Sequence, residues 1–148
     1  MKRALPLLLV TLLLSSVIGC SSGGSKDAML SSLASEPAVT ALAEKVGVTA
    51  DQAVGGLGAV LSLAKNKVSA EDFSKLVSGI PSAQKYMDAA GKMGVKGGDI
   101  KTPVDLKEAY AKLGMNEQAA SDFSAAAVNF VRSASGEAAA SVLSGLGF

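Results

Sequence analysis

One side chain in this sequence has distinctive covalent chemistry, the thiol of Cys20, because the chain contains a single cysteine and no histidine. A single cysteine cannot form a disulfide within the chain, and without imidazole there are too few ligands for a thiolate or histidine metal site. The Ser-His-Asp and Cys-His nucleophile systems are excluded for the same reason. A carboxylate pair is still allowed, but no spacing of Asp or Glu indicates one. We therefore expect no catalytic, cofactor-binding or metal-binding residues, no cofactor and no enzymatic activity.

Cys20 comes directly after a segment that has the layout of a secretory signal. Lys2 and Arg3 make a short basic start, and residues 4–14 are almost entirely apolar. A basic start, an apolar run and small residues at the end are typical of a signal peptide. The apolar run is shorter than the ~20 residues that a membrane-spanning helix needs. Residues 1–19 are therefore predicted to be a cleaved signal.

The kind of signal is indicated by the sequence Val17-Ile18-Gly19-Cys20. An aliphatic residue three positions before a cysteine resembles the lipobox of bacterial lipoproteins. That resemblance implies a diacylglycerol on the Cys20 sulfur, cleavage just before Cys20 and often a further acyl chain on the new amine. Two or three acyl chains anchor a protein to a membrane without spanning it. The alternative is an ordinary signal with an incidental cysteine.

The residues that follow Cys20 predict where the rest of the chain lies. Residues 20–26 comprise the lipidated cysteine and a Gly/Ser-rich flexible tether with a reach of ~12–15 Å. Ser21 stands where an aspartate usually marks retention at the inner membrane, so the resemblance implies the outer membrane, facing the periplasm, in a Gram-negative host. Residues 27–148 would form one small domain close to the membrane surface of the bacterial cell envelope.

The charge of the chain argues against nucleic acid as a partner. There are 14 Lys and Arg side chains and 13 Asp and Glu side chains. Removal of Lys2 and Arg3 with the signal leaves 12 basic side chains against the same 13 acidic ones. Binding to nucleic acid needs a basic patch or stripe, and the sequence has no basic run.

Apolar residues recur at the spacing i, i+3, i+4, i+7 along most of the predicted domain, which places one apolar stripe on a helix. Such stripes begin at Val39, Phe73, Tyr86, Leu106 and Ala139. Two longer segments, 50–67 and 117–134, carry a broader apolar face, and no persuasive run alternates with a period of two. The pattern predicts an all-α fold, a single small bundle of six or seven short helices.

Capping chemistry predicts where the helices begin and end. Thr49 and Gln52 match the capping box, in which two side chains satisfy free amides of the first turn. Other residues suited to helix starts are Pro37, Ser69, Pro81, Thr102 with Pro103, and Asn116. Gly47 and Gly114 follow apolar runs, where a left-handed C-cap is favoured.

The chain has a weak internal sequence similarity at an offset of 67 residues, where Val46-Gly47-Val48-Thr49 corresponds to Leu113-Gly114-Met115-Asn116. Each half would contain a helix end, a cap, a long helix and a short amphipathic helix. This pattern indicates either a pseudo-repeat of two helical halves or the chance similarity of alanine-rich helices.

Two glycine-rich stretches need an explanation. Each glycine of Gly55-Gly56-Leu57-Gly58 costs a helix about 0.8–1.0 kcal/mol relative to alanine. We expect close approach of a neighbouring helix; the alternatives are a kink or ligand contact, and a helix that begins only after Gly58. Residues 94–102 superficially resemble a phosphate loop, but Ile100 stands where a Walker motif needs glycine. A mobile surface loop is expected there.

The string from Val46 to Leu61, together with Ile80-Pro81 and Leu113-Gly114-Met115, resembles a bacterial family of unknown function, the VcgC/VcgE-type domain. The similarity covers roughly residues 38 to 146. It implies a small helical exported protein, often a lipoprotein, and it assigns no catalytic or binding residue.

Three functions remain open at this point. The first is a non-enzymatic, lipid-anchored interaction or structural module that binds another envelope protein or itself. The second is a carrier or sensor of a small apolar ligand in a cavity of the bundle, for which Met87, Met93 and Met115 would be adaptable lining residues. The third is an enzyme that uses carboxylates or lysine. An exposed apolar patch would favour the first, an apolar pocket the second, and clustered carboxylates with shifted pKa values the third.

Overall fold

The computed structural model describes residues 26–147, so the predicted signal, Cys20 and residues 21–25 of the tether lie outside the described residues. Within that range the chain forms eight α-helices and a short 3₁₀-helix, with no strand. In chain order these are α1 (Lys26–Ala34), α2 (Pro37–Val46), α3 (Ala50–Lys67), α4 (Ala70–Val77), α5 (Ala83–Lys92), η1 (Gly97–Asp99), α6 (Pro103–Lys112), α7 (Glu117–Ser135) and α8 (Glu137–Ser144). The all-α class is confirmed.

The number of helices is larger than predicted. The expected six or seven is wrong because α1 was missed, and it begins at Lys26, the last residue of the predicted tether. Its apolar residues Met29, Leu30 and Leu33 make only a narrow stripe, and of these Leu33 alone is fully buried. A helix with so little periodicity is held by its contacts with α3 and α5 rather than by a pattern visible in sequence.

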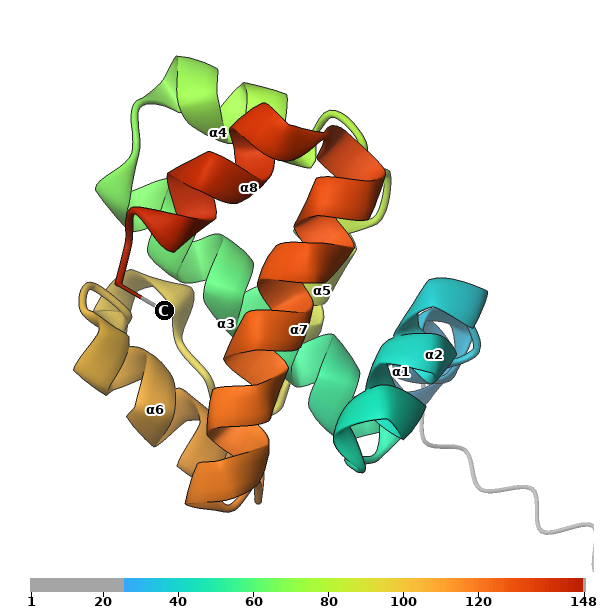
Figure 1. Cartoon of the computed structure of the whole chain (residues 1–148). Helices are drawn as coiled ribbons and strands as arrows, with labels where there is room; N and C mark the ends of the chain where they lie inside the picture. Colours follow the sequence, from blue (N-terminus) through green and yellow to red (C-terminus); the bar gives the residue numbers. More distant parts are fainter. Residues whose placement is uncertain (1–25, 148) are drawn as a thin grey trace, which may run out of the picture.

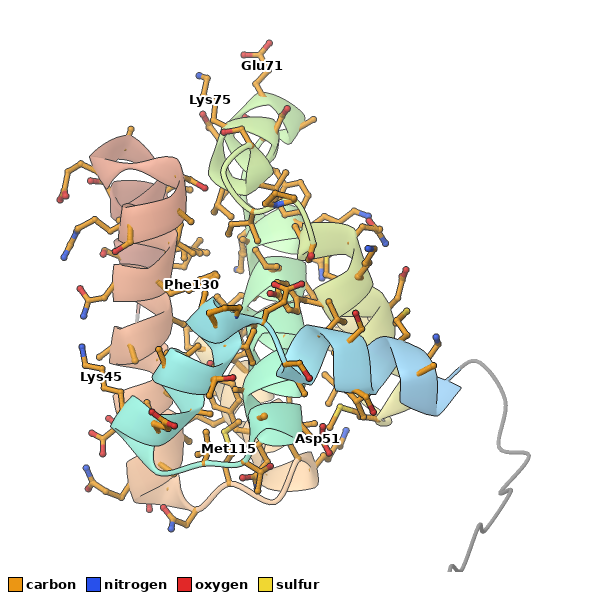
Figure 2. The ribbon with its side chains drawn as sticks, turned by 90° about the vertical axis from the view of Figure 1, so that its right-hand side faces the viewer. Lys45, Asp51, Glu71, Lys75, Met115 and Phe130 are labelled. Atoms are coloured by element: carbon orange, nitrogen blue, oxygen red, sulfur yellow. The ribbon has the colours of Figure 1, made fainter. Side chains whose placement is uncertain are left out.

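Helix α3 is the centre of the molecule, and the other helices are arranged around it (Figure 1). Every residue from 53 to 64 is buried, on all sides of the helix. Its most extensive neighbour is α5, and α1, α2 and α6 also pack against it. In Figure 2, Phe130 of α7 points toward α2, whereas Glu71 and Lys75 of α4 point into solvent.

The three glycines of α3 lie in close contact with neighbouring segments. The helix begins at Ala50, so a start after Gly58 is wrong. A Cβ atom on Gly55 would lie 2.7 Å from a methyl of Leu113, and one on Gly56 would lie 2.6 Å from the Phe123 ring. At Gly58 the obstacle is the backbone oxygen of Tyr86, at 2.1 Å. The expected close approach of a neighbouring helix is confirmed.

Helix boundaries follow the predicted caps. The Thr49 hydroxyl accepts from the Gln52 amide at 3.1 Å, and the Gln52 side chain accepts from the Thr49 amide at 2.9 Å. The Asn116 side chain accepts from the Ala119 amide at 2.8 Å at the start of α7. The C-cap positions Gly47 and Gly114 have φ of 75° and 81°, in the left-handed region. The remaining predicted starts hold at Pro37, Ser69 and Thr102, whereas α5 begins two residues after Pro81.

At an offset of 67 residues, the start of α3 corresponds to the start of α7, and both ends of α4 correspond to both ends of α8. The surroundings differ, because α3 is buried on all sides and α7 on one side only. The pseudo-repeat stays a prediction.

Within residues 26–147 no single helix is long and apolar enough to cross a membrane. The consecutive helices α2 and α3 reach that length and composition only together, and the chain bends by 99° between them.

Candidate functional site

In Figure 1, α6 and the end of the chain after α8 lie next to one another beside α7. Residues of these three segments line a hollow at the surface. We name it the α6–α7 groove; its volume is about 500 Å³. The residues that line it are Pro103, Leu106, Lys107, Ala120, Ser121, Ser124, Ala125, Val128, Asn129, Ser144 and Gly147. Leu106 and Ala120 are buried and give it an apolar floor, while serines, an amide and one ammonium group form its polar part.

A second hollow of about 630 Å³ continues along α7 toward its first turn. It is lined by Lys107, Asn116, Glu117, Gln118 and Ser121, so Lys107 and Ser121 belong to both hollows. Neither Lys107 nor Glu117 makes an ion pair with another described residue. The combined surface therefore presents one basic and one acidic side chain that the domain itself does not neutralise.

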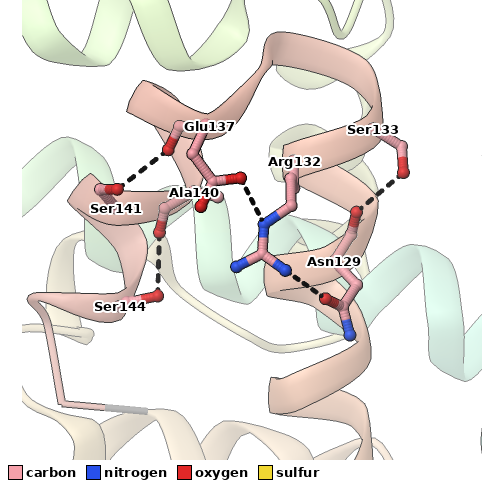
Figure 3. A network of polar contacts seen from close by, with 7 residues as sticks. All are labelled: Asn129, Arg132, Ser133, Glu137, Ala140, Ser141 and Ser144. Carbon is pink, nitrogen blue, oxygen red and sulfur yellow. Dashed lines mark hydrogen bonds and ion pairs between the residues drawn. The ribbon is translucent and has the colours of Figure 1, made fainter.

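The other cation near this surface is already paired (Figure 3). Arg132 contacts Glu137 at 2.9 Å across the junction of α7 and α8, and it donates to the Asn129 side chain, also at 2.9 Å. On α8 the Ser144 hydroxyl donates to the Ala140 carbonyl at 3.0 Å. Lys107 is thus the cation that the groove offers to a ligand.

The floor of the groove rests on a fixed core. Tyr110 is fully buried, and its ring packs edge-on against Phe123 with the centroids 5.6 Å apart. Its hydroxyl lies 3.4 Å from the Ser124 hydroxyl, which also donates to the Ala120 carbonyl at 3.0 Å. Burial raises the pKa of Tyr110 above its ordinary value. Because this tyrosine stays neutral and enclosed, it supports the groove without supplying chemistry to it.

A second polar cluster joins the first turn of α2 to α5. Glu36, which precedes α2, accepts a hydrogen bond from Ser82 at 2.8 Å and another from the Tyr86 hydroxyl. Tyr86 is almost completely buried, and burial first, then its bond to Glu36, raises its pKa. Like Tyr110, Tyr86 lies in the core. The cluster fastens α2 to the body of the domain.

Residues 94–102 were expected to form a mobile surface loop, but in the structure they pack against the core. Val95 and Ile100 are buried, and the Asn66 side chain donates to the carbonyls of Gly97 and Ile100 at 2.7 and 2.8 Å. Helix η1 occupies its middle. This loop is fixed by core contacts that its glycine-rich sequence does not reveal.

The methionines proposed as lining residues have different surroundings. Met93 and Met115 fill the space above Gly55 and Gly56, and Met115 is buried. Met87 is half-buried and borders a hollow of about 250 Å³ that Ser62, Lys65 and Asn66 also line. The structure therefore does not bring the three methionines together around one cavity.

The α6–α7 groove was missed from sequence. Val104, the one large apolar side chain among the described residues that is mostly exposed, at 65%, lies one turn before Lys107. In the sequence, Val104 falls outside the apolar stripe that begins at Leu106, and this apolar residue on the polar side of a helix is the signal that would have drawn attention to this surface.

These features define a class: a small all-helical domain packed around one buried helix, with a surface groove of mixed polarity. Groups of three or more His, Cys, Asp or Glu placed to hold a metal ion are absent from residues 26–147. The chain matches the family model of proteins of unknown function VcgC/VcgE (DUF2780) over residues 20–147, and it belongs to that family. No curated protein and no solved structure matches the chain.

Proposed function

We propose that the chain is a lipid-anchored protein of the bacterial cell envelope whose helical domain is a non-enzymatic interaction module. The observation that carries the anchoring is the lipobox-like Val17–Cys20, which follows a signal-like segment and precedes a short Gly/Ser tether. Acyl chains on Cys20 would hold the domain at a membrane surface. The membrane we propose is the outer membrane, with the domain facing the periplasm.

Support for an interaction module comes from the character of the domain. The pKa values of Tyr86 and Tyr110 are raised and that of Asp105 is lowered, and each shift has a structural cause within the fold. The hollow beside α7 has too mixed a lining for a purely apolar ligand, yet it offers hydroxyl, amide and charged groups that suit a protein surface. Val104 adds one exposed apolar contact, so the interface we propose is mainly polar.

Intact-mass analysis of the protein extracted from membranes tests the anchoring. We expect a chain that begins at Cys20 and carries the mass of two or three acyl groups. An unmodified chain cut at another position would contradict the proposal.

A second candidate function is the transport or sensing of a small, partly apolar molecule. The volume of the α6–α7 groove lies within the range of small-molecule sites, ~300–1,000 Å³. Such a ligand would sit in this surface groove, because side chains fill the space beside the α3 glycines. Retention of a small molecule through native-state mass spectrometry, lost on Ala125→Phe, would favour this candidate over the interaction module.

A further inference from the structure

The open side of α7 corresponds to a covered side of α3. At the offset of 67 residues, Gly58 and Ser62 of α3 correspond to Ala125 and Asn129 of α7. On α3 these positions are covered: Gly58 lies against Tyr86 and Ala90 of α5, and Ser62 lies against Gly97. On α7 the matching positions line the α6–α7 groove. The side of α3 that α5 and η1 cover is therefore uncovered at the matching positions of α7.

The charges along this side fit a second copy of the same chain. A two-fold contact brings identical surfaces together, so each basic group must meet an acidic group of the same surface. Lys107 of α6 and Glu117 in the first turn of α7 line the same hollow as Ser121, and neither is paired within the described residues. A two-fold axis near Ser121 would place each Lys107 opposite the other copy's Glu117, and exposed Val104 would meet the partner at the edge.

From these observations we propose that two copies of the protein associate through the α6–α7 groove, with α7 packed against α7 of the second copy and two symmetric Lys107–Glu117 ion pairs. The two hollows extend from Asn116 to Asn129, ~20 Å along the helix at 1.5 Å per residue. So short a surface makes a weak contact between free molecules. Anchoring of both copies in one membrane raises their effective concentration, and to this extent the inference rests on the proposed function.

Charge reversal in separate copies tests the pairing. Lys107→Glu gives a surface with two acidic groups, and Glu117→Lys gives one with two basic groups, so each variant repels itself. Mixed together, the two variants form two ion pairs again, one of them the original Lys107–Glu117 pair and the other with its charges exchanged. Restoration in the mixture cannot come from contacts within one chain, which separates association from a change in folding.

The experiment uses the full chain in its host membrane. One copy carries a photo-crosslinking amino acid at Gln118, an exposed residue at the edge of the second hollow, and the other carries an epitope tag. We expect a crosslinked homodimer for the unaltered pair, at least a tenfold loss when both copies carry Lys107→Glu or both carry Glu117→Lys, and recovery when one copy carries each. The control places the crosslinker at Ser74 of α4, an exposed residue outside both hollows, and should give no homodimer.

Other results would overturn the inference. No homodimer, an equal yield from Ser74, or a yield that charge reversal does not change would each show that the groove does not bind a second copy. A crosslink from Gln118 to a different protein would also reject self-association, yet it would leave the proposed interaction module standing. Failure of the anchoring itself is recognised separately, by the mass of the extracted chain.

Discussion

At the scale of single residues, the predicted location of the protein depends on Cys20. We expect Cys20→Ala to leave an unprocessed precursor or to release the protein from the membrane, because the sulfur that would accept the lipid is gone. Membrane fractionation with immunoblotting of the variant and the unaltered protein measures this. If the alanine variant were processed and membrane-bound to the same extent, lipidation at Cys20 would be excluded.

The two buried tyrosines form a matched pair with different hydroxyl environments. We expect Tyr86→Phe to lower the free energy of unfolding by ~1.5–3 kcal/mol, because the hydroxyl donates to the Glu36 carboxylate and bonds to charged groups are the stronger ones. Tyr110→Phe is the control and should cost under ~1 kcal/mol, because its hydroxyl meets Ser124 only at 3.4 Å. Urea titration of the two variants gives the comparison. Equal losses would show that the Glu36 contact adds nothing to stability.

At the scale of helices, the glycines separate tight packing from helix propensity. We expect Gly58→Ala to cost ~1–3 kcal/mol or more, because the new Cβ would meet the backbone of Tyr86, which cannot move aside. Gly91→Ala on α5 is the control: nothing lies within 4 Å, so the substitution should stabilise by up to ~1 kcal/mol. Thermal melts of both variants measure the difference, and the same sign for both would contradict it.

Gly55 provides an intermediate case on the same helix. Its nearest obstacles are the flexible side-chain ends of Leu113 and Met93, so Gly55→Ala should be close to neutral. Gly55→Leu should destabilise clearly, because a side chain of that size has no free space.

We expect the stability of the domain to depend on pH through Asp105, in the first turn of α6. The Asp105 carboxylate accepts from the amides of Lys101 and Thr102 at 3.0 and 2.9 Å, and these bonds, together with the Thr102 hydroxyl, lower its pKa below 3.8. A carboxylate with a lowered pKa in the folded state stabilises above its unfolded pKa, and that contribution is lost as the pH falls through the folded value. The melting temperature of Asp105→Asn should therefore be lower than that of the unaltered protein at pH 7 and should converge with it as the pH falls through the lowered pKa of Asp105. A constant difference across this range would rule out the ionised carboxylate as the cause.

Most helix boundaries could be predicted from sequence because they depend on local chemistry. The caps at Thr49, Thr102 and Asn116 act on amides three residues away, so the pattern is contained within one turn. Which segments cover α3 could not be predicted, since the residues above its glycines lie in α5, in α7 and just after α5 and α6. The groove escaped prediction for the same reason: its lining comes from α6, α7 and the chain after α8, and no single segment shows it.

At the scale of the whole molecule, the domain should fold without any metal. We expect the far-UV circular dichroism of the purified protein to be purely helical, and its melting temperature to be unchanged by EDTA. The reasons are the helical architecture of residues 26–147 and the lack of histidine and of a second cysteine in the chain. A strand signal in the spectrum, or a lower melting temperature with EDTA, would contradict this.

The complete enclosure of α3 also governs how the protein exchanges its amide hydrogens with solvent. Amides from 53 to 64 are covered on all sides by other helices, so partial opening of a single neighbour does not expose them all. Exchange at such positions requires opening of the entire domain, and its rate then reports the global free energy of unfolding. Deuterium uptake by this one helix is thus a direct measure of the stability of the domain.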